Sequence, residues 1–127
     1  MDKALLVGVG GFIGSILRYL LAGAVQSAVI GSTLPYGTLV VNVTGCFAIG
    51  LVSQMVEVQG ALAPGARAFL VVGVLGGYTT FSAFGNETVN LIRDGQHLAA
   101  GMNVSGQLVL ALCAVWLGRF TAHLIWR

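Results

Sequence analysis

The chain has 127 residues, of which 57% are hydrophobic and only 8% are charged. Soluble domains typically carry about 25% charged residues, so this composition excludes an ordinary water-soluble globular protein and a disordered chain. The net charge of +2 is scattered, without the basic patch that nucleic-acid binding needs. Positions 19–56, 68–86 and 95–118 contain no Asp, Glu, Lys or Arg, and a membrane-spanning helix needs about 20 apolar residues. We therefore predict an integral, multi-pass protein of the lipid bilayer.

Turn-forming residues divide the apolar sequence into four segments. Glycine and proline cluster around positions 31–35 and 63–65, and a third turn follows at Arg93-Asp94-Gly95. The sequence predicts four membrane-spanning helices, at about residues 4–25, 37–56, 66–89 and 98–118. These helices fill nearly the whole chain, so we expect a single all-α transmembrane domain over residues 1–127.

The first apolar segment has some features of a cleaved signal peptide. Lys3 precedes it, and Ala22-Gly23-Ala24 is similar to a cleavage site. However, Arg18 and Tyr19 interrupt the apolar run just before that site, and the glycines at positions 8, 10, 11 and 14 suit close helix packing. We expect a first helix that is retained.

Residues typical of an enzyme are scarce. The sequence has no phosphate-binding GxxxxGK[ST] motif and no convincing Ser/His/Asp or Cys/His set. Cys46 and Cys113 lie inside apolar segments without a CxxC spacing, which indicates small buried thiols. His97 and His123 fall near the ends of the fourth span, where interfacial residues are common. We expect a protein that is not an enzyme.

The third segment contains an unusual motif at its centre, Gly76-Gly77-Tyr78-Thr79-Thr80. Adjacent glycines followed by a β-branched pair make a poor helix interior. Irregular backbone at membrane depth is tolerated only where protein buries it or where it lines an aqueous site. We predict that the third helix is broken at Gly76–Thr80, with carbonyl groups free to coordinate a cation such as Na⁺.

Aromatic and polar residues gather around this motif. Phe81 and Phe84 are three residues apart and share a helical face; the rings either pack together or turn their positive edges toward an anion. Two i, i+4 pairs of polar residues lie inside the second and fourth spans: Thr38 with Asn42, and Asn103 with Gln107. Spacing alone leaves open whether these pairs hold helices together or form a polar track across the membrane. Thr44 lies on another face, and we expect it to bond to its own helix.

Three groups of residues occur together in this chain: Gly10-Gly11-Phe12-Ile13-Gly14 with Arg18-Tyr19, then Gly37-Thr38-Leu39 with Val41-Asn42 and Gly45, and then Gly76-Gly77-Tyr78-Thr79-Thr80-Phe81-Ser82-Ala83-Phe84. In this combination the sequence resembles the CrcB/Fluc family of fluoride channels. The third group is the most specific, and the resemblance extends over essentially the full length. It implies small four-helix subunits that assemble as antiparallel, dual-topology homodimers. It also implies passive export of fluoride across the inner (plasma) membrane of a bacterium.

The resemblance also implies roles for individual residues. Phe81 and Phe84 would form an anion-facing aromatic pair, and Asn42 would be the pore-lining amide donor. The carbonyls of Gly76 and Thr79 would be ligands of a central Na⁺, two from each subunit. The remaining expected residues are Thr38, Ser82, Asn103 and Gln107 in the pore lining and Arg18 at an aqueous vestibule. The family more often has a hydroxyl residue where Ala83 stands, and Tyr and Ser where this chain has Asn103 and Gln107.

Two other functions compete with a channel. A small four-helix multidrug or cation/proton antiporter needs a titratable carboxylate within a span, and only Glu87 is near enough, although we expect it at the mouth of the pore. A non-transporting assembly subunit would use Gly10-x-x-x-Gly14 and Gly73-x-x-x-Gly77 for packing alone.

The distribution of Lys and Arg between the two ends of the spans predicts how the chain is oriented in the membrane. Four spans put both termini on one side with Lys3, Arg67, Arg119 and Arg127, against Arg18 and Arg93 on the other. This bias of 4 against 2 is small, so we expect insertion in both orientations.

Overall fold

The computed structural model describes residues 3–60 and 62–126, and the regular secondary structure in these ranges is entirely helical. Four helical segments are long and apolar enough to cross a membrane. They are α1 (Lys3–Ala28), α2 (Tyr36–Gln59), a third span from Pro64 to Arg93, and α6 (His97–Ile125). The prediction of a multi-pass membrane protein with four spans is confirmed. Arg127, which the charge count includes, lies outside the described residues.

The third span consists of four consecutive pieces. A short helix α3 (Pro64–Arg67) leads into the π-helix η1 (Ala68–Leu75), which is followed by one helical turn, α4 (Gly76–Tyr78). After an interruption at Thr79 and Thr80, the chain continues as α5 (Phe81–Arg93). The interruption of the third span is as expected, whereas the π-helical winding before it had no signal in the sequence.

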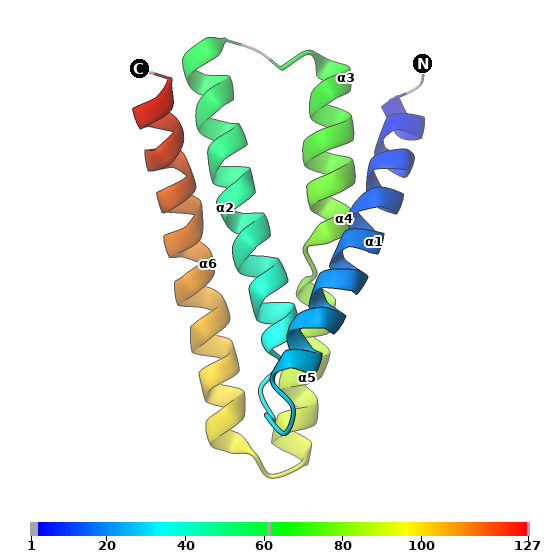
Figure 1. The fold of residues 1–127 in the computed structure, drawn as a ribbon, viewed down its shortest axis with the longest axis vertical. Helices are drawn as coiled ribbons and strands as arrows, with labels where there is room; N and C mark the ends of the chain where they lie inside the picture. The colour runs from blue at the N-terminus through cyan, green and yellow to red at the C-terminus, as the bar shows by residue number, and fades with distance from the viewer. Residues whose placement is uncertain (1–2, 61, 127) are drawn as a thin grey trace.

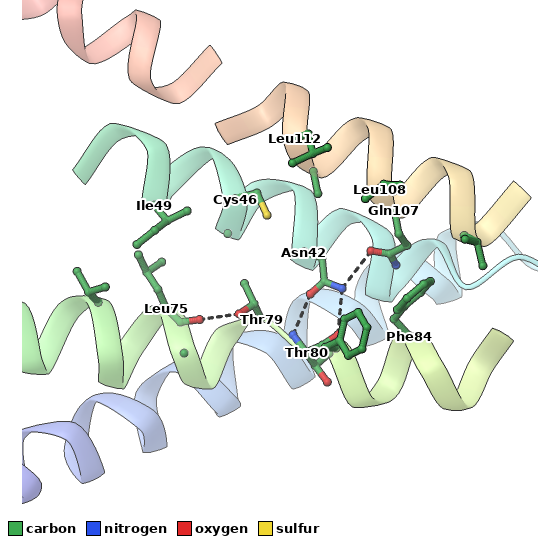
Figure 2. Close-up of a pocket in the computed structure, with 16 residues that line it drawn as sticks. Asn42, Cys46, Ile49, Leu75, Thr79, Thr80, Phe84, Gln107, Leu108 and Leu112 are labelled. Carbon is green, nitrogen blue, oxygen red and sulfur yellow. Dashed lines mark hydrogen bonds between the residues drawn. The ribbon is translucent and has the colours of Figure 1, made fainter. Parts of the chain in front are cut away.

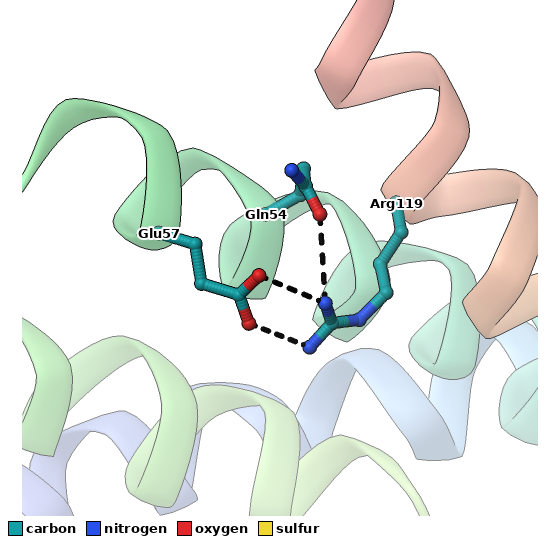
Figure 3. A network of polar contacts seen from close by, with 3 residues as sticks. All are labelled: Gln54, Glu57 and Arg119. Carbon is teal, nitrogen blue, oxygen red and sulfur yellow. Dashed lines mark hydrogen bonds and ion pairs between the residues drawn. The ribbon is translucent and has the colours of Figure 1, made fainter.

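The helix α6 continues past position 118, where the predicted fourth span ends, to Ile125, and therefore includes Arg119. The Arg119 guanidinium forms two parallel bonds with the Glu57 carboxylate, at 2.9 and 3.1 Å, and a longer bond of 3.5 Å with the Gln54 side chain (Figure 3). Glu57 and Gln54 lie near the end of α2. This ion pair joins α2 and α6 at the end of the bundle where α6 ends.

The spans are arranged as two helix pairs that diverge toward the end where α1 begins and α6 ends (Figure 1). In one pair α2 packs chiefly on α6, and in the other α1 packs chiefly on η1. Glycines permit the close approach in both pairs. A Cβ atom at Gly118 would collide with the Phe47 carbonyl oxygen, and one at Gly14 would collide with that of Val74.

The GxxxG patterns therefore have a packing role inside one chain. Gly10 and Gly14 of α1 lie directly against the backbone of η1, and a Cβ atom at Gly77 would be 2.6 Å from the Gly11 carbonyl oxygen. Backbone contact of this kind fixes the position of α4 relative to α1. Glycines that pack helices within one chain are compatible with a transporting protein as well as with an assembly subunit.

Candidate functional site

The interruption of the third span is shorter than the sequence indicates. Only Thr79 (φ −79°, ψ 157°) and Thr80 (φ −150°, ψ 113°) are extended, while Gly76, Gly77 and Tyr78 are helical. The predicted break at Gly76–Thr80 is therefore corrected to two residues. Gly77 packs directly against α1, whereas a Cβ atom at Gly76 would make only an ordinary contact. The Thr80 hydroxyl accepts a hydrogen bond of 3.2 Å from the Ala83 N–H and so caps the start of α5.

An amide side chain from α2 satisfies the backbone at the break. The Thr80 N–H donates to Asn42 Oδ1 at 2.8 Å, and Asn42 Nδ2 donates to the Thr80 carbonyl at 3.1 Å. Figure 2 shows both bonds. In a continuous helix the Thr80 N–H would instead bond to the Gly76 carbonyl, four residues earlier. Asn42 Oδ1 thus takes the place of the Gly76 carbonyl as the acceptor for the Thr80 N–H. The Gly76 carbonyl is left without the hydrogen bond that a continuous helix would give it.

A groove with a volume of about 570 Å³ lies beside the break. Its polar lining comes from Asn42, Thr79, Thr80 and Gln107, and its remaining walls are glycines and mostly apolar side chains of α2, η1, α5 and α6. Phe81 and Phe84 both line this groove, with ring centroids 5.4 Å apart and planes inclined by 58°. The Phe81 side chain is 83% exposed, so most of its surface lacks a packing partner within the described chain. Packing between the two rings leaves Phe81 largely free to contact something else.

The two polar residues predicted on the fourth span are both almost fully buried, but they have different partners. Asn103 is 4% exposed and donates to the Thr88 hydroxyl of α5 at 3.0 Å. Gln107 is 6% exposed, and its Oε1 accepts a bond of 3.1 Å from Asn42 Nδ2 (Figure 2). Asn103 therefore joins α6 to α5, whereas Gln107 connects α6 to the break through Asn42.

The remaining predicted residues lie around a second hollow, of about 560 Å³, lined by Arg18, Thr38 and Ser82 together with Thr80, which also lines the groove. The Arg18 Nη1 donates to the Thr79 carbonyl at 3.3 Å, so its charge lies at the break itself. Thr38 is bonded at 2.6 Å to Glu87 Oε1. The hollow combines the cationic Arg18 with the hydroxyl groups of Thr80 and Ser82, which favour an anion, whereas the Thr38 hydroxyl is occupied by the Glu87 carboxylate.

Several contacts of the site were not predicted. The bond from Thr38 to Glu87 places that carboxylate against α2, in a half-buried position. Tyr78 shares a 2.7 Å hydrogen bond with Thr44 across the α4–α2 contact, and Thr44 also bonds to Val40 of its own helix as expected. These partners are 34 to 49 residues apart in the chain. Helical spacing identifies residues that share a face, but it does not pair residues on different helices.

The potential cation ligands at the break are backbone oxygens. Among the described residues, no group of three or more His, Cys, Asp or Glu side chains is arranged to hold a metal ion. Gly76 and Thr79 both line the groove, and the Gly76 carbonyl lacks its helical partner. The Thr79 carbonyl accepts one bond from Arg18 and has a second lone pair. These oxygens fit a hard cation such as Na⁺.

Comparison with known proteins gives consistent results over nearly the full chain. A family model described as "CrcB-like protein, Camphor Resistance (CrcB)" matches residues 5–119. A protein of Opitutus terrae called "Fluoride-specific ion channel FluC" is 48% identical over 124 residues, which cover 96% of this chain and 93% of the relative. A protein of Nitratidesulfovibrio vulgaris with the same name is 45% identical over 125 residues, covering 98% of this chain and 100% of the relative. A similar protein of Methanosarcina acetivorans, "Fluoride-specific ion channel FluC 1", is 41% identical over 122 residues, covering 96% of this chain and 92% of the relative.

Proposed function

The chain belongs to the CrcB family, and we propose that it is a fluoride-selective channel that lets fluoride leave the cell passively and so limits its toxicity. The observation that carries this proposal is the similarity, at 45–48% identity over nearly the whole length, to proteins named fluoride-specific ion channels. The groove beside the helix break supports it, since polar groups and aromatic rings converge there within four apolar spans.

Fluoride selectivity follows from the chemistry of the groove. Fluoride is small and strongly hydrated, so a pore must replace its water with hydrogen-bond donors at short range. We assign this role to the amide and hydroxyl groups at and near the break. The edges of the Phe81 and Phe84 rings carry partial positive charge and complete the lining. The proposed lining consists of Asn42, Phe81, Phe84 and Gln107 in the groove, Thr38 and Ser82 at the second hollow, and Asn103, one helical turn before Gln107 on α6.

Charges around this path favour an anion. Arg18 lies in the second hollow and attracts anions toward the break. We propose that the carbonyls of Gly76 and Thr79 would hold a structural Na⁺, two from each subunit. When bound, that cation offsets the cost of placing anionic charge in a medium of low dielectric constant.

We further propose an antiparallel homodimer in the inner membrane of a bacterium. Four spans are too few to surround a pore, and one wall of the groove is open, with Phe81 largely uncovered. The small charge bias between the two ends of the bundle favours insertion in both directions. Reporter proteins fused to the C-terminus would then be found on both sides of the membrane. If they appear on one side only, the subunits cannot be antiparallel.

The direct test of function uses proteoliposomes loaded with fluoride. An electrode should record rapid fluoride efflux from vesicles that contain the protein, and slow efflux from empty vesicles. Proton-coupled uptake of a cationic substrate is the matched measurement for an antiporter. Glu87→Gln separates the two functions, because glutamine can still accept the bond from Thr38 but cannot exchange protons. A channel keeps its fluoride efflux in this variant, whereas an antiporter loses activity.

A further inference from the structure

The side chain of Tyr78 reaches from the short helix α4 to α2, where its hydroxyl lies 2.7 Å from the Thr44 hydroxyl. The Thr44 hydroxyl has a single hydrogen, and it directs this hydrogen to carbonyls of its own helix, those of Val40 at 2.7 Å and Val41 at 3.1 Å. Tyr78 is therefore the donor and Thr44 the acceptor. Both groups lie within apolar spans, where water does not readily replace a lost partner.

The backbone around Tyr78 fits closely between α1 and α2. A Cβ atom at Gly14 of α1 would lie 2.8 Å from the Tyr78 N. On the other side, a Cβ atom at Gly45 of α2 would lie 3.1 Å from Cδ1 of the Tyr78 ring and would collide with the Thr79 methyl group. Tyr78 lines neither the groove nor the second hollow. Its contacts therefore hold α4 in place and do not reach an ion.

Thr79 is held to α2 on both of its sides. The residue before it, Tyr78, bonds to Thr44 through its side chain. The residue after it, Thr80, bonds to Asn42 through its backbone. Thr44 and Asn42 are two positions apart in α2, and successive positions of a helix are turned by about 100°. Their side chains therefore leave α2 in nearly opposite directions and hold the break from two sides.

The bonds on either side of Thr79 determine where its carbonyl points. The Thr79–Thr80 peptide is trans, so its N–H and carbonyl groups point in opposite directions. Asn42 holds the N–H, and the carbonyl is consequently directed toward Arg18 of α1, whose Nη1 lies 3.3 Å away. The freedom that remains is a shift of the α4 turn against α2, which would move the carbonyl with it.

We infer that Tyr78 is a positioning residue, whose bond to Thr44 keeps the Thr79 carbonyl where a cation ligand must be. This inference rests on the proposed Na⁺ site and names a side chain that holds its ligands in place. Gly76 and Tyr78 belong to the same helical turn, so a shift of α4 would displace both proposed ligands. A site with ligands already in place binds more tightly, because binding then requires less ordering of the chain.

The test uses the full chain purified without Na⁺, in buffers where N-methylglucamine chloride replaces NaCl. Thermal unfolding at rising Na⁺ concentrations gives the concentration that produces half of the stabilisation by Na⁺. Fluoride efflux from proteoliposomes is measured at the same concentrations.

Four variants separate the bond from its surroundings. Tyr78→Phe removes the donor and keeps the ring, Thr44→Val removes the acceptor and keeps the branched shape, and Thr44→Ser keeps the acceptor. Thr121→Val is the matched control, because the Thr121 hydroxyl bonds only to the Leu117 carbonyl of its own helix.

We expect Tyr78→Phe and Thr44→Val each to raise the half-saturating Na⁺ concentration by about 3- to 10-fold, as the loss of one neutral hydrogen bond predicts. Thr44→Ser and Thr121→Val should equal the wild type. Tyr78→Phe combined with Thr44→Val should match the single variants, because both changes remove the same bond. At saturating Na⁺, fluoride efflux in the single variants should return to the wild-type rate.

Two results would overturn the inference. A half-saturating Na⁺ concentration in Tyr78→Phe equal to that of the wild type, with or without a lower melting temperature, would give the bond a packing role only. Effects that multiply in the double variant would mean that the two hydroxyl groups act separately.

Failure of the proposed function gives different results. A wild-type protein whose unfolding does not respond to Na⁺ would remove the cation site, and the inference with it. A wild-type protein that responds to Na⁺ but shows no fluoride efflux would remove the channel function and leave the positioning role of Tyr78 in place.

Discussion

Both helix pairs of this protein pack closely through glycine residues, but only one of them consists of two continuous helices. In the α2–α6 pair, glycines bring two continuous helices together at Gly50 and Gly118. In the other pair, glycines bring α1 against a third span that is π-helical and then interrupted. Close glycine packing therefore does not break a helix by itself. The interruption is stable because Asn42, from the first pair, supplies the hydrogen bonds that the second pair lacks.

The largest expected effect comes from removing this connection between the pairs. Asn42→Leu leaves the Thr80 N–H and carbonyl without partners, at a cost of about 1–3 kcal/mol for each group. We expect a clear loss of thermal stability in detergent and loss of fluoride efflux. Thr121→Val is the control, because this exposed hydroxyl bonds only to the Leu117 carbonyl of its own helix. A stability for Asn42→Leu equal to that of the control would mean that the break does not depend on α2.

The second prediction tests the continuous pair. A Cβ atom at Gly118 would be 2.9 Å from the Leu51 N and would collide with the Phe47 carbonyl, so Gly118→Ala should destabilise the protein by about 1–3 kcal/mol. Gly106 lies on the same helix with no atom near its Cβ position, and Gly106→Ala should be neutral or stabilise by about 0.5–1 kcal/mol. Thermal unfolding followed by circular dichroism measures both. Equal effects would contradict tight α2–α6 contact.

The third prediction concerns the aromatic side of the break. Phe81→Ile and Phe84→Ile retain apolar bulk and remove the ring edges. We expect each variant to lower fluoride efflux by about tenfold while the protein still assembles, because 1.5 kcal/mol, the upper value for an aromatic interaction, corresponds to about that factor. Normal efflux in both variants would show that the rings have a packing role only.

The smallest effect is expected at the end of the continuous pair. Arg119→Gln removes the bidentate bond to Glu57, whose two partners are both more than 40% exposed. Exposed ion pairs contribute only about 0–1 kcal/mol, so the melting temperature should fall slightly and efflux should not change. A loss of efflux would show that this end of the bundle takes part in conduction.

The four spans could be predicted because a membrane imposes a simple rule. Segments without Asp, Glu, Lys or Arg must lie in the bilayer, and turn residues separate them. The far end of α6 was harder to predict, because Arg119 normally marks the end of a span and its partner Glu57 is 62 residues away. The rule considers each segment separately, whereas the charge of Arg119 in α6 is matched by Glu57 of α2.

The candidate site was predictable in the identity of its residues but not in their pairing. The motif Gly76–Thr80 indicated a break, and the four polar residues of the second and fourth spans stood out as polar groups inside apolar segments. The exact break at Thr79 and Thr80 depends on Asn42, which also bonds to Gln107 of α6. Such bonds between distant positions follow from the fold and not from local spacing.

The π-helical winding of η1 (Ala68–Leu75) has a consequence for how the third span tolerates changes in length. A π-helix bonds residue i to residue i+5, so each of its hydrogen-bonded loops encloses one residue more than that of an α-helix. Deletion of one residue in this segment can be absorbed by rewinding a π turn as an α turn, which leaves α3 and the break in register. A deletion in the continuous α2 or α6 has no such surplus, and would rotate every following side chain by about 100°.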